Sequence, residues 1–323
     1  MSYKEERNNE LEEQLQERIV KDNFNNDIIT NFFYYFESGN SKLNYYYAIK
    51  GFFNWMISND IINCSVEEMS IDDIKKIKVV DCIKYFDSYK KDHKGTSLKT
   101  QMNFLSSFYS YLNANYDLKN IIKLVPKNKY KTVSSNREKK MPSDKEVLDL
   151  LQSIKENSYP SLRLRNEAMF WILVGTGIRA SECVGLDKKD VHLDCEIPYI
   201  EVIRKGSYDE ESKDIVYLNK SAIDPIRKYI ESRRDDNIEA LFIDNKNQRL
   251  KLRGLQGFIE RNSNGNITPH MLRHYYITKL YENTRDINLV QDQAGHVAGS
   301  SITGDVYIST SGRINEVTQA KII

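Results

Sequence analysis

The chain has 323 residues, of which 40% are hydrophobic and 29% are charged, so it is long enough to form two ordinary domains with buried cores. No apolar run approaches the ~20 residues that a membrane-spanning helix needs, and the Glu- and Lys-rich N-terminus is unlike a signal sequence. These features predict a cytoplasmic protein without a membrane segment. A formal net charge of +1 is low for a nucleic-acid-binding protein, so any contact with phosphate is expected on particular faces.

The four cysteines indicate neither a disulfide framework nor a metal site. Cys64, Cys82, Cys183 and Cys195 form no CxxC or CxxH pair, and a chain of this size does not need disulfides for its stability. We therefore expect reduced thiols. Cys183 falls in a predicted helix, where burial as a small apolar residue is the simplest expectation.

The first 125 residues predict helices. In residues 1–23 the apolar residues are four apart, at Leu11, Leu15 and Ile19, which indicates a short and mostly exposed helical extension. In residues 24–125 apolar side chains recur at i, i+3, i+4 and i+7, which predicts a helical bundle. The main members of this second pattern are Phe32, Phe33, Phe36, Tyr46, Ile49, Phe53, Met56, Phe104, Phe108, Tyr111 and Leu112.

A helix boundary is expected near residue 95. The segment Lys94-Gly95-Thr96-Ser97 reads as a helix end followed by the N-cap of a helix over about 98–112. Lys99 lies in the first turn of that helix and is a candidate contact to DNA.

Residues 126–142 have the composition of an exposed linker, because they are rich in Lys, Asn, Ser and Thr and poor in apolar residues. The segment is also basic, and a basic strip can bind phosphate in a protein of neutral net charge. The alternative is a solvated connector whose lysines only keep it soluble. The candidate DNA-binding lysines in this linker are Lys127, Lys129, Lys131, Lys139 and Lys140.

Residues 143–323 predict a mixed α+β domain. A helix is expected after Ser143, and the apolar run over 168–174 predicts a buried one. Residues 199–203 and 214–218 are β-rich and are joined by a polar turn, as in a hairpin. Helical patterns return in the rest of the chain, so helices and strands mix in this domain.

Five short motifs follow one another in this second domain. They read Gly177-Ile-Arg179-Ala-Ser-Glu182, Arg204-Lys205-Gly206, His270-Met-Leu-Arg273-His274, Gly295-His296 and Val306-Tyr307-Ile308. Their order, spacing and residue types resemble those of the tyrosine recombinase or phage integrase family, over about the last half of the chain and more weakly over the helices before it. The resemblance implies two domains, an all-α core-binding (SAM-like) helical bundle and a mixed α+β catalytic domain of the tyrosine-recombinase type.

Two of the arginines suit a phosphate group. Breaking a phosphodiester without a metal requires a nucleophile, charge neutralisation at the non-bridging oxygens and a proton for the departing oxygen. Arg179 and Arg273 carry planar guanidinium forks that can hold phosphate oxygens bidentately. The alternative for Arg179 is a salt bridge with Glu182 on the following turn.

The segment Thr268-Pro269-His270 has the form of an N-cap, a proline at the first helical position and a histidine at the helix start. Free amides and the helix dipole favour phosphate at such a start. His270, Arg273 and His274 are then spaced to share one face of the helix. His270 is therefore a candidate phosphate ligand, and His274 either supports it or packs.

The family resemblance implies the remaining roles. His296 would be a second hydrogen-bond donor to the scissile phosphate, and Tyr307 would be the nucleophile that forms a 3′-phosphotyrosyl enzyme. Lys205 would protonate the departing 5′ oxygen, and Glu182 would orient a basic group of the site. The chain departs from the commonest family pattern by about two extra residues between His296 and Tyr307.

Other residues of the same types have competing explanations. Arg204 and Lys213 flank the turn that carries Lys205 and are alternatives to it. Tyr275, Tyr276 and Tyr281 are expected to be packing residues of a helix rather than nucleophiles.

The expected function is site-specific recombination of double-stranded DNA by a homotetramer, monomeric or dimeric when free, for integration or excision of a mobile element or resolution of DNA multimers. Because a phosphotyrosine keeps the bond energy, no ATP, metal or other cofactor is expected. The alternatives are type IB topoisomerase-like nicking and resealing, and a DNA-binding relative without catalysis. Residues 313–323 have an apolar face. In related recombinases such a tail docks on a neighbouring subunit, and the alternative is a helix that closes its own domain.

Overall fold

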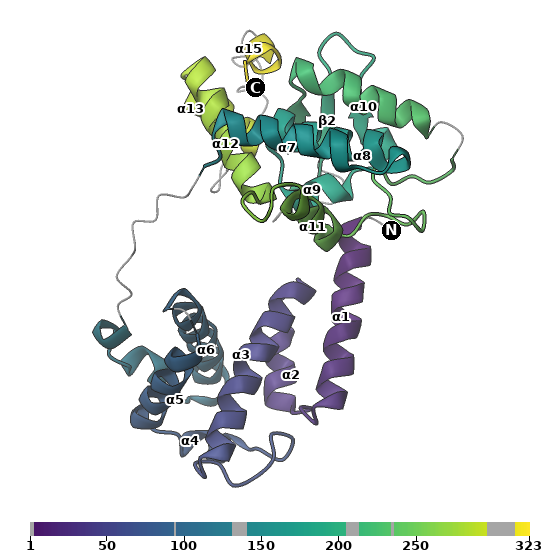
Figure 1. The fold of residues 1–323 in the computed structure, drawn as a ribbon. Coiled ribbons are helices and arrows are strands. Elements are labelled where there is room, and N and C mark those ends of the chain that lie inside the picture. The colour runs from purple at the N-terminus through teal and green to yellow at the C-terminus, as the bar shows by residue number, and fades with distance from the viewer. Residues whose placement is uncertain (1–2, 94, 131–140, 205–212, 234–235, 296–313) are drawn as a thin grey trace. The chain divides into compact units, whose positions relative to one another are not determined.

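A computed structural model describes the chain except for residues 1–2, 94, 131–140, 205–212, 234–235 and 296–313 (Figure 1). The chain divides into two compact units, Met1–Arg137 and Glu138–Ile323. The division falls inside the segment that the sequence predicts as a linker. In the described part of the chain, no helix is both long and apolar enough to span a membrane.

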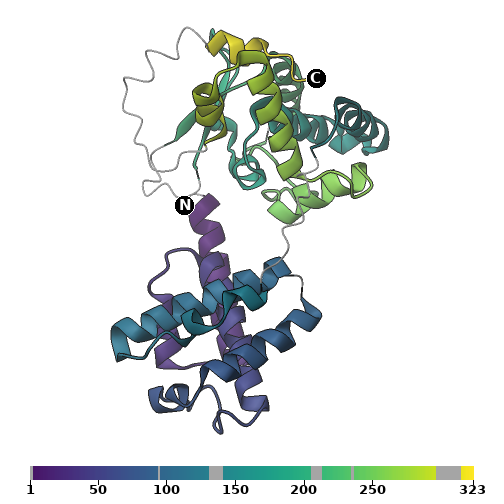
Figure 2. The same ribbon diagram turned by 90° about the vertical axis from the view of Figure 1, so that its left-hand side faces the viewer.

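The first unit is a helical bundle, drawn in purple to blue (Figure 2). Each helix is amphipathic or has an apolar stripe, so the bundle buries these faces together. Its elements are α1 (Tyr3–Lys21), α2 (Asp27–Phe33), α3 (Gly39–Ser58), α4 (Ile71–Lys75), α5 (Val79–Asp92), α6 (Gly95–Tyr116) and the short 3-10 helices η1 (Ile121–Leu124) and η2 (Lys127–Tyr130).

Helix α1 belongs to this bundle rather than extending from it. Leu15 and Ile19 are only 1% and 4% exposed, because α1 packs along α3. The side-chain oxygen of Asn8 accepts a 2.6 Å hydrogen bond from the amide of Gly39, and Glu12 pairs with Lys42. The predicted apolar stripe is therefore present, but it serves as part of the core.

Aromatic rings fill the interior of the bundle. The ring of Phe32 makes edge-on contacts with Phe36, Tyr45 and Phe108 at centroid distances of 5.0, 5.0 and 5.2 Å. Edge-to-face pairs of this kind stabilise a core beyond the area they bury. Helix α6 begins at Gly95, two residues before the N-cap that the sequence predicts at Ser97.

The second unit is a mixed α+β domain in which α8 packs against α7, α10 and α12 (Figure 1). Strand β2 pairs antiparallel with both β1 and β3, and Tyr199 lies opposite Tyr217. The predicted hairpin strands are present, whereas β1 was not predicted. The elements are α7 (Asp144–Asn157), α8 (Pro160–Thr176), α9 (Ala180–Gly185), η3 (Lys188–Asp190), β1 (Val191–His192), β2 (Tyr199–Val202), β3 (Asp214–Tyr217), α10 (Lys220–Ser232), α11 (Leu252–Asn262), α12 (Pro269–Thr284), α13 (Ile287–Ala294) and α15 (Ile314–Gln319).

The C-terminal residues pack against their own unit in this single chain. Val317 is fully buried, and Ile322 is 3% exposed. The side-chain Nδ2 of Asn219 donates to the carbonyl of Ala320 at 2.8 Å, and the Tyr275 hydroxyl donates to the carbonyl of Ile322 at 2.7 Å. The apolar face predicted over 313–323 thus has a partner within the chain.

Candidate active site

The turn between α8 and α9 brings Arg179 to the edge of the domain core. Helix α8 is capped at its C-terminus by Gly177, whose φ of +64° is a left-handed conformation that glycine adopts readily. A Cβ at this position would lie 2.2 Å from Cδ1 of Tyr276, so only glycine fits. The chain can therefore turn directly from α8 into the N-cap of α9, which is Arg179.

Glu182 accepts hydrogen bonds from both the backbone amide and the guanidinium of Arg179. Its Oε2 accepts from the Arg179 amide at 2.8 Å, and its Oε1 accepts from the Arg179 Nη1 at 2.7 Å. The Glu182 side chain is 3% exposed, whereas that of Arg179 is 33% exposed. The salt bridge offered as the alternative explanation for Arg179 is therefore present, and it orients a guanidinium that still reaches the surface.

Arg273 is buried on α12, at 3% exposure. Its Nη1 donates to the carbonyl of Gly177 at 2.7 Å, and its Nη2 donates to the carbonyl of Ala294. Burial, followed by the positive charge of Arg179, lowers the pKa of the Arg273 guanidinium to about 10. Arg273 therefore remains charged at neutral pH.

The two histidines of α12 lie together at the helix start, as their spacing predicts. Thr268 is the N-cap, and its side-chain oxygen accepts from the amide of Met271 at 3.3 Å. The Nε2 atoms of His270 and His274 are 2.8 Å apart, so one ring donates and the other accepts. His270 is exposed and His274 is half-buried.

A third arginine, Arg204, joins the cluster from the end of β2. It is 8% exposed, and its Nη1 donates to Oε2 of Glu182 at 3.2 Å. Glu182 is therefore shared between two guanidinium groups. The sequence indicated Arg204 only as an alternative to Lys205, not as a partner of Glu182.

The alternating burial of β2 would have identified Arg204. Along this strand Ile200 and Val202 are buried, whereas Tyr199 and Glu201 are half-buried. Side chains alternate between the two faces of a strand, so Arg204 falls on the buried face. An arginine on a buried face almost always has fixed partners.

Three residues of the predicted set lie outside the described residues. They are Lys205, His296 and Tyr307. The structure describes the segments that lead to them, which are the end of β2, the start of β3 and the end of α13 at Gly295. It brings Arg179, Glu182 and Arg273 together and places His270 and His274 on the same helix as Arg273.

The competing residues are engaged elsewhere. Lys213 pairs with Asp190 and Glu201. Tyr275 and Tyr276 are fully buried, and burial raises the pKa of both hydroxyls well above its ordinary value.

The structure contradicts the expectation for Tyr281 and confirms that for Cys183. Tyr281 is 41% exposed, so its predicted packing role is wrong, because it lies on the outer face of α12. Cys183 is fully buried as predicted, and the four cysteines are unpaired.

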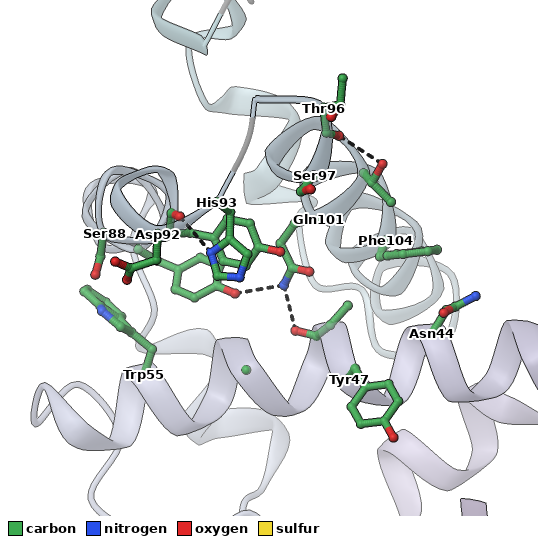
Figure 3. Close-up of a pocket in the computed structure, with 15 residues that line it drawn as sticks. Asn44, Tyr47, Trp55, Ser88, Asp92, His93, Thr96, Ser97, Gln101 and Phe104 are labelled. Carbon is green, nitrogen blue, oxygen red and sulfur yellow. Dashed lines mark hydrogen bonds between the residues drawn. The ribbon is translucent and has the colours of Figure 1, made fainter. Parts of the chain in front are cut away.

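The helical unit carries a groove of about 700 Å³ between α3, α5 and α6 (Figure 3). At its base Gln101 donates to the carbonyl of Ala48 and to the hydroxyl of Tyr85, both at 2.8 Å. Beside it, the rings of Tyr89 and His93 stack with centroids 3.8 Å apart.

Of the predicted DNA-binding lysines, the structure describes the side chains of two, and one of these lies next to the groove. Lys99 is exposed in the first turns of α6, next to the groove-lining residue Thr100. Lys129 forms an ion pair with Asp87, which lowers the pKa of that carboxyl. Nothing is described of the Lys127 side chain or of the linker lysines Lys131, Lys139 and Lys140.

Among the residues that the structure describes, no cluster of three or more His, Cys, Asp or Glu side chains could hold a metal ion.

Residues 141–311 match the phage integrase family model. The chain is 34% identical to the tyrosine recombinase XerD of Oceanobacillus iheyensis over 199 residues, which cover 58% of this chain and 61% of that protein. The match thus spans less than two thirds of the length of this relative.

Two solved structures share the fold. A XerH site-specific recombinase bound to its difH substrate has a TM-score of 0.62 at 21% identity, over 87% of this chain and 78% of that one. A lambda integrase tetramer bound to a Holliday junction has a TM-score of 0.61 at 17% identity, over 90% and 82% of the two chains. These likenesses confirm the fold class expected from the sequence, a helical domain followed by an α+β domain.

Proposed function

This chain belongs to the phage integrase family, and we propose that it is a site-specific recombinase that cleaves and rejoins DNA strands through a 3′-phosphotyrosyl intermediate. One observation carries the proposal. Arg179 donates to the carbonyl of Gly295 and Arg273 donates to the carbonyl of Ala294, so both guanidinium groups lie at the end of α13. Two guanidinium groups held this close together, one of them a third exposed, suit the non-bridging oxygens of one phosphate.

In the proposed reaction the hydroxyl oxygen of Tyr307 attacks phosphorus and releases its phenolic proton to solvent. A bond forms between this oxygen and phosphorus, and the bond between phosphorus and the 5′ oxygen breaks. The ammonium of Lys205 gives its proton to the departing 5′ oxygen. A 5′-hydroxyl from another DNA end then reverses the attack and rejoins the strand. The groups proposed to hold the phosphate are Arg179, His270, Arg273 and His296.

Supporting roles are proposed for Glu182 and His274. Glu182 orients Arg179 through two hydrogen bonds. His274 lies within hydrogen-bonding distance of His270 and would set its tautomer.

The state of the neighbouring side chains supports this choice of nucleophile and acid. Tyr275 and Tyr276 are buried with raised pKa values, so neither is available as a nucleophile. Lys213 is bound by two carboxylates, which leaves Lys205 as the better acid of the β2–β3 turn.

We assign DNA binding to both units. In this assignment residues 1–23 and 24–125 form the core-binding part, residues 126–142 are a basic linker, and residues 143–323 are catalytic. Lysines along the linker would contact the DNA backbone, which is the sequence-independent part of such binding. The proposed contacts are Lys99, Lys127, Lys129, Lys131, Lys139 and Lys140.

The proposed assembly is a homotetramer on two double-stranded recombination sites. The tetrameric lambda integrase on a Holliday junction, which shares this fold, supports this assembly. Integration or excision of a mobile element and resolution of DNA multimers in the cytoplasm are the proposed settings.

The test begins with duplex DNA selected from a random pool by the full-length protein. A selected duplex is then nicked next to the cleaved phosphate, so that the released fragment diffuses away and the covalent complex accumulates. We expect wild-type protein to become linked to DNA and Tyr307→Phe to bind the same duplex without becoming linked. A Tyr307→Phe protein that still forms the adduct would contradict the assignment of the nucleophile.

A second measurement separates recombination from topoisomerase activity. Two intact duplexes of different length that carry the selected site are incubated with the protein, and the products are sized. Recombination predicts strands joined between the two duplexes. Nicking and resealing within each duplex, with relaxation of a supercoiled plasmid, would instead indicate a topoisomerase.

A further inference from the structure

Arg204 is a buried arginine that ties together three parts of the second unit. Its Nε donates to Asp214 at the start of β3 at 3.2 Å. Its Nη1 donates to Glu182 of α9 at 3.2 Å, and its Nη2 donates to the carbonyl of Gln293 near the end of α13 at 3.0 Å. Each of its three nitrogens therefore has a protein partner.

Arg204 bonds through all three of its nitrogens, whereas the bonds of Arg179 and Arg273 come from their two terminal nitrogens. Burial separates Arg204 from Arg179 alone, because Arg273 is itself 3% exposed. The Arg204 side chain is 9% exposed, against 33% for Arg179. Three of its five N–H groups are already bonded, and its partner Glu182 is a buried carboxylate. Removing one partner of a buried charge pair is costly, so this bond is expected to persist when DNA binds.

The end of α13 is held by all three arginines. Arg204, Arg273 and Arg179 donate, in this order, to the carbonyls of residues 293, 294 and 295. The last carbonyls of a helix have no partner within the helix and carry its negative dipole end, so cations bind well there. Gln293 adds a fourth tie, because its side-chain oxygen accepts from the amide of Tyr217 in β3 at 3.1 Å.

These contacts link the phosphate-binding side chains to the segment that follows α13. Through Glu182, Arg204 fixes the carboxylate that orients Arg179. Through the Gln293 carbonyl, it fixes the helix end from which the chain continues to His296. A shift of Arg204 would therefore move both parts of the proposed phosphate site.

We propose that Arg204 is a positioning residue of the strand-cleavage site, acting through Glu182 and through the end of α13 without contacting the DNA. The proposal rests on the proposed recombinase function and adds a residue to it. Misplacing reacting groups by about 1 Å can cost about 100-fold in rate. Loss of Arg204 should therefore slow cleavage and leave DNA affinity unchanged.

The first test compares Arg204→Met with Arg233→Met. Arg233 is a matched control, because it is also a buried arginine of this unit, held by Asp236 and the carbonyl of Ala240. We expect Arg204→Met to lower the single-turnover rate of covalent complex formation about 100-fold, with affinity for the uncleaved duplex changed less than about twofold. Arg233→Met should lower the melting temperature without a comparable loss of rate.

The second test keeps the Arg204 side chain and displaces it. A Cβ on Gly295 would lie 2.6 Å from the Nε of Arg204, so Gly295→Ala should push the guanidinium away. Gly265→Ala is the matched control, because Gly265 also has a positive φ of 77° and its added Cβ would meet none of the described atoms within 4 Å. Both variants place a side chain at a residue with a positive φ, so both carry the same kind of backbone strain. Only Gly295→Ala should slow cleavage.

The outcomes separate the two proposals. No covalent product from wild-type protein would contradict the recombinase function itself. Product at the same rate from wild type, Arg204→Met and Gly295→Ala would contradict only the role of Arg204. A parallel fall in affinity and rate in Arg204→Met would also overturn it, since it would make Arg204 a DNA contact. If Arg204→Met does not fold, cleavage by Gly295→Ala as fast as by Gly265→Ala would overturn the role of Arg204.

Discussion

The two units bury different kinds of side chain. The core of the helical unit is built from rings such as Phe32, Phe53 and Phe108, which pack edge to face. The second unit also buries charged groups, among them Arg204 and Arg273, and satisfies them with carboxylates and helix carbonyls. Apolar packing depends on volume, whereas these polar contacts depend on direction and charge. Substitutions in the aromatic core of the first unit should therefore affect stability, whereas substitutions in the arginine cluster of the second unit should affect the rate of cleavage.

The largest effect should come from Arg273→Lys. An ammonium keeps the charge but cannot reproduce the two bonds to Gly177 and Ala294 while binding phosphate. We expect the rate of covalent complex formation to fall by about 10²–10³-fold in single-turnover assays.

Arg165→Lys is the control for this change. Arg165 donates to the carbonyl of Ile243 at 2.7 Å, away from the arginine cluster. Cleavage by Arg273→Lys as fast as by Arg165→Lys would contradict the role of the arginine cluster in the rate of cleavage.

Lys205→Ala tests the proton donor in the same unit. On an ordinary phosphodiester we expect cleavage to slow by about 10²-fold, because the departing alkoxide is not protonated. On DNA with sulfur in place of the bridging 5′ oxygen, the variant should approach the wild-type rate, because a thiolate leaves without a proton.

Lys213→Ala provides the comparison for that experiment. Lys213 is held by Asp190 and Glu201, so its loss should affect both substrates alike. If sulfur rescued Lys213→Ala and not Lys205→Ala, the proton donor would have to be reassigned.

Phe53→Ala tests how much the aromatic core of the helical unit contributes to stability. Phe53 is fully buried, so truncation should lower the free energy of unfolding of the helical unit by about 3–5 kcal/mol. Denaturant unfolding followed by circular dichroism measures this change. Tyr34→Ala, at a ring that is 79% exposed, should change the stability by less than about 0.5 kcal/mol. Equal losses in the two variants would show that the aromatic interior does not carry the stability.

The smallest effect concerns pH. Arg233, followed by Lys188, lowers the pKa of Asp236 below its ordinary value. A depressed pKa contributes stability that is fully present above about pH 4 and is lost as the pH falls through the folded pKa. Asp236→Asn should therefore destabilise the protein by about 1–2 kcal/mol at pH 7, and the difference from wild type should shrink on acidification.

Thermal melts at a series of pH values measure this effect. Asp224→Asn, at an exposed position of α10, should melt like wild type throughout. A difference between Asp236→Asn and wild type that stayed constant down to pH 3 would contradict the ion-pair explanation.

Much of the fold followed from local patterns in the sequence. The i, i+3, i+4 spacing around Phe53 predicted the bundle, and Thr268-Pro269 predicted the start of α12, because apolar periodicity and capping are local properties. Strand β1 was missed because two residues are too few to show an alternating pattern.

The site was predicted in part. The motifs led to Arg179, Glu182 and Arg273, which the structure brings together. The role of α13 could not be predicted, because the arginines bind its backbone carbonyls. Every residue has a backbone carbonyl, so the sequence does not mark these contacts. Arg204 was visible only through the alternation of β2, and recognising it required knowing which face of the strand is buried.

The close approach of Tyr276 to Gly177 has a consequence for how this sequence can change over time. A side chain at 177 is blocked both by the positive φ and by the ring of Tyr276. A smaller residue at 276 would remove the second obstacle and leave the first, so the two positions do not simply compensate for each other. Sequence drift in this part of the chain should therefore begin at Tyr276, and Gly177 should be the last position in the turn to vary.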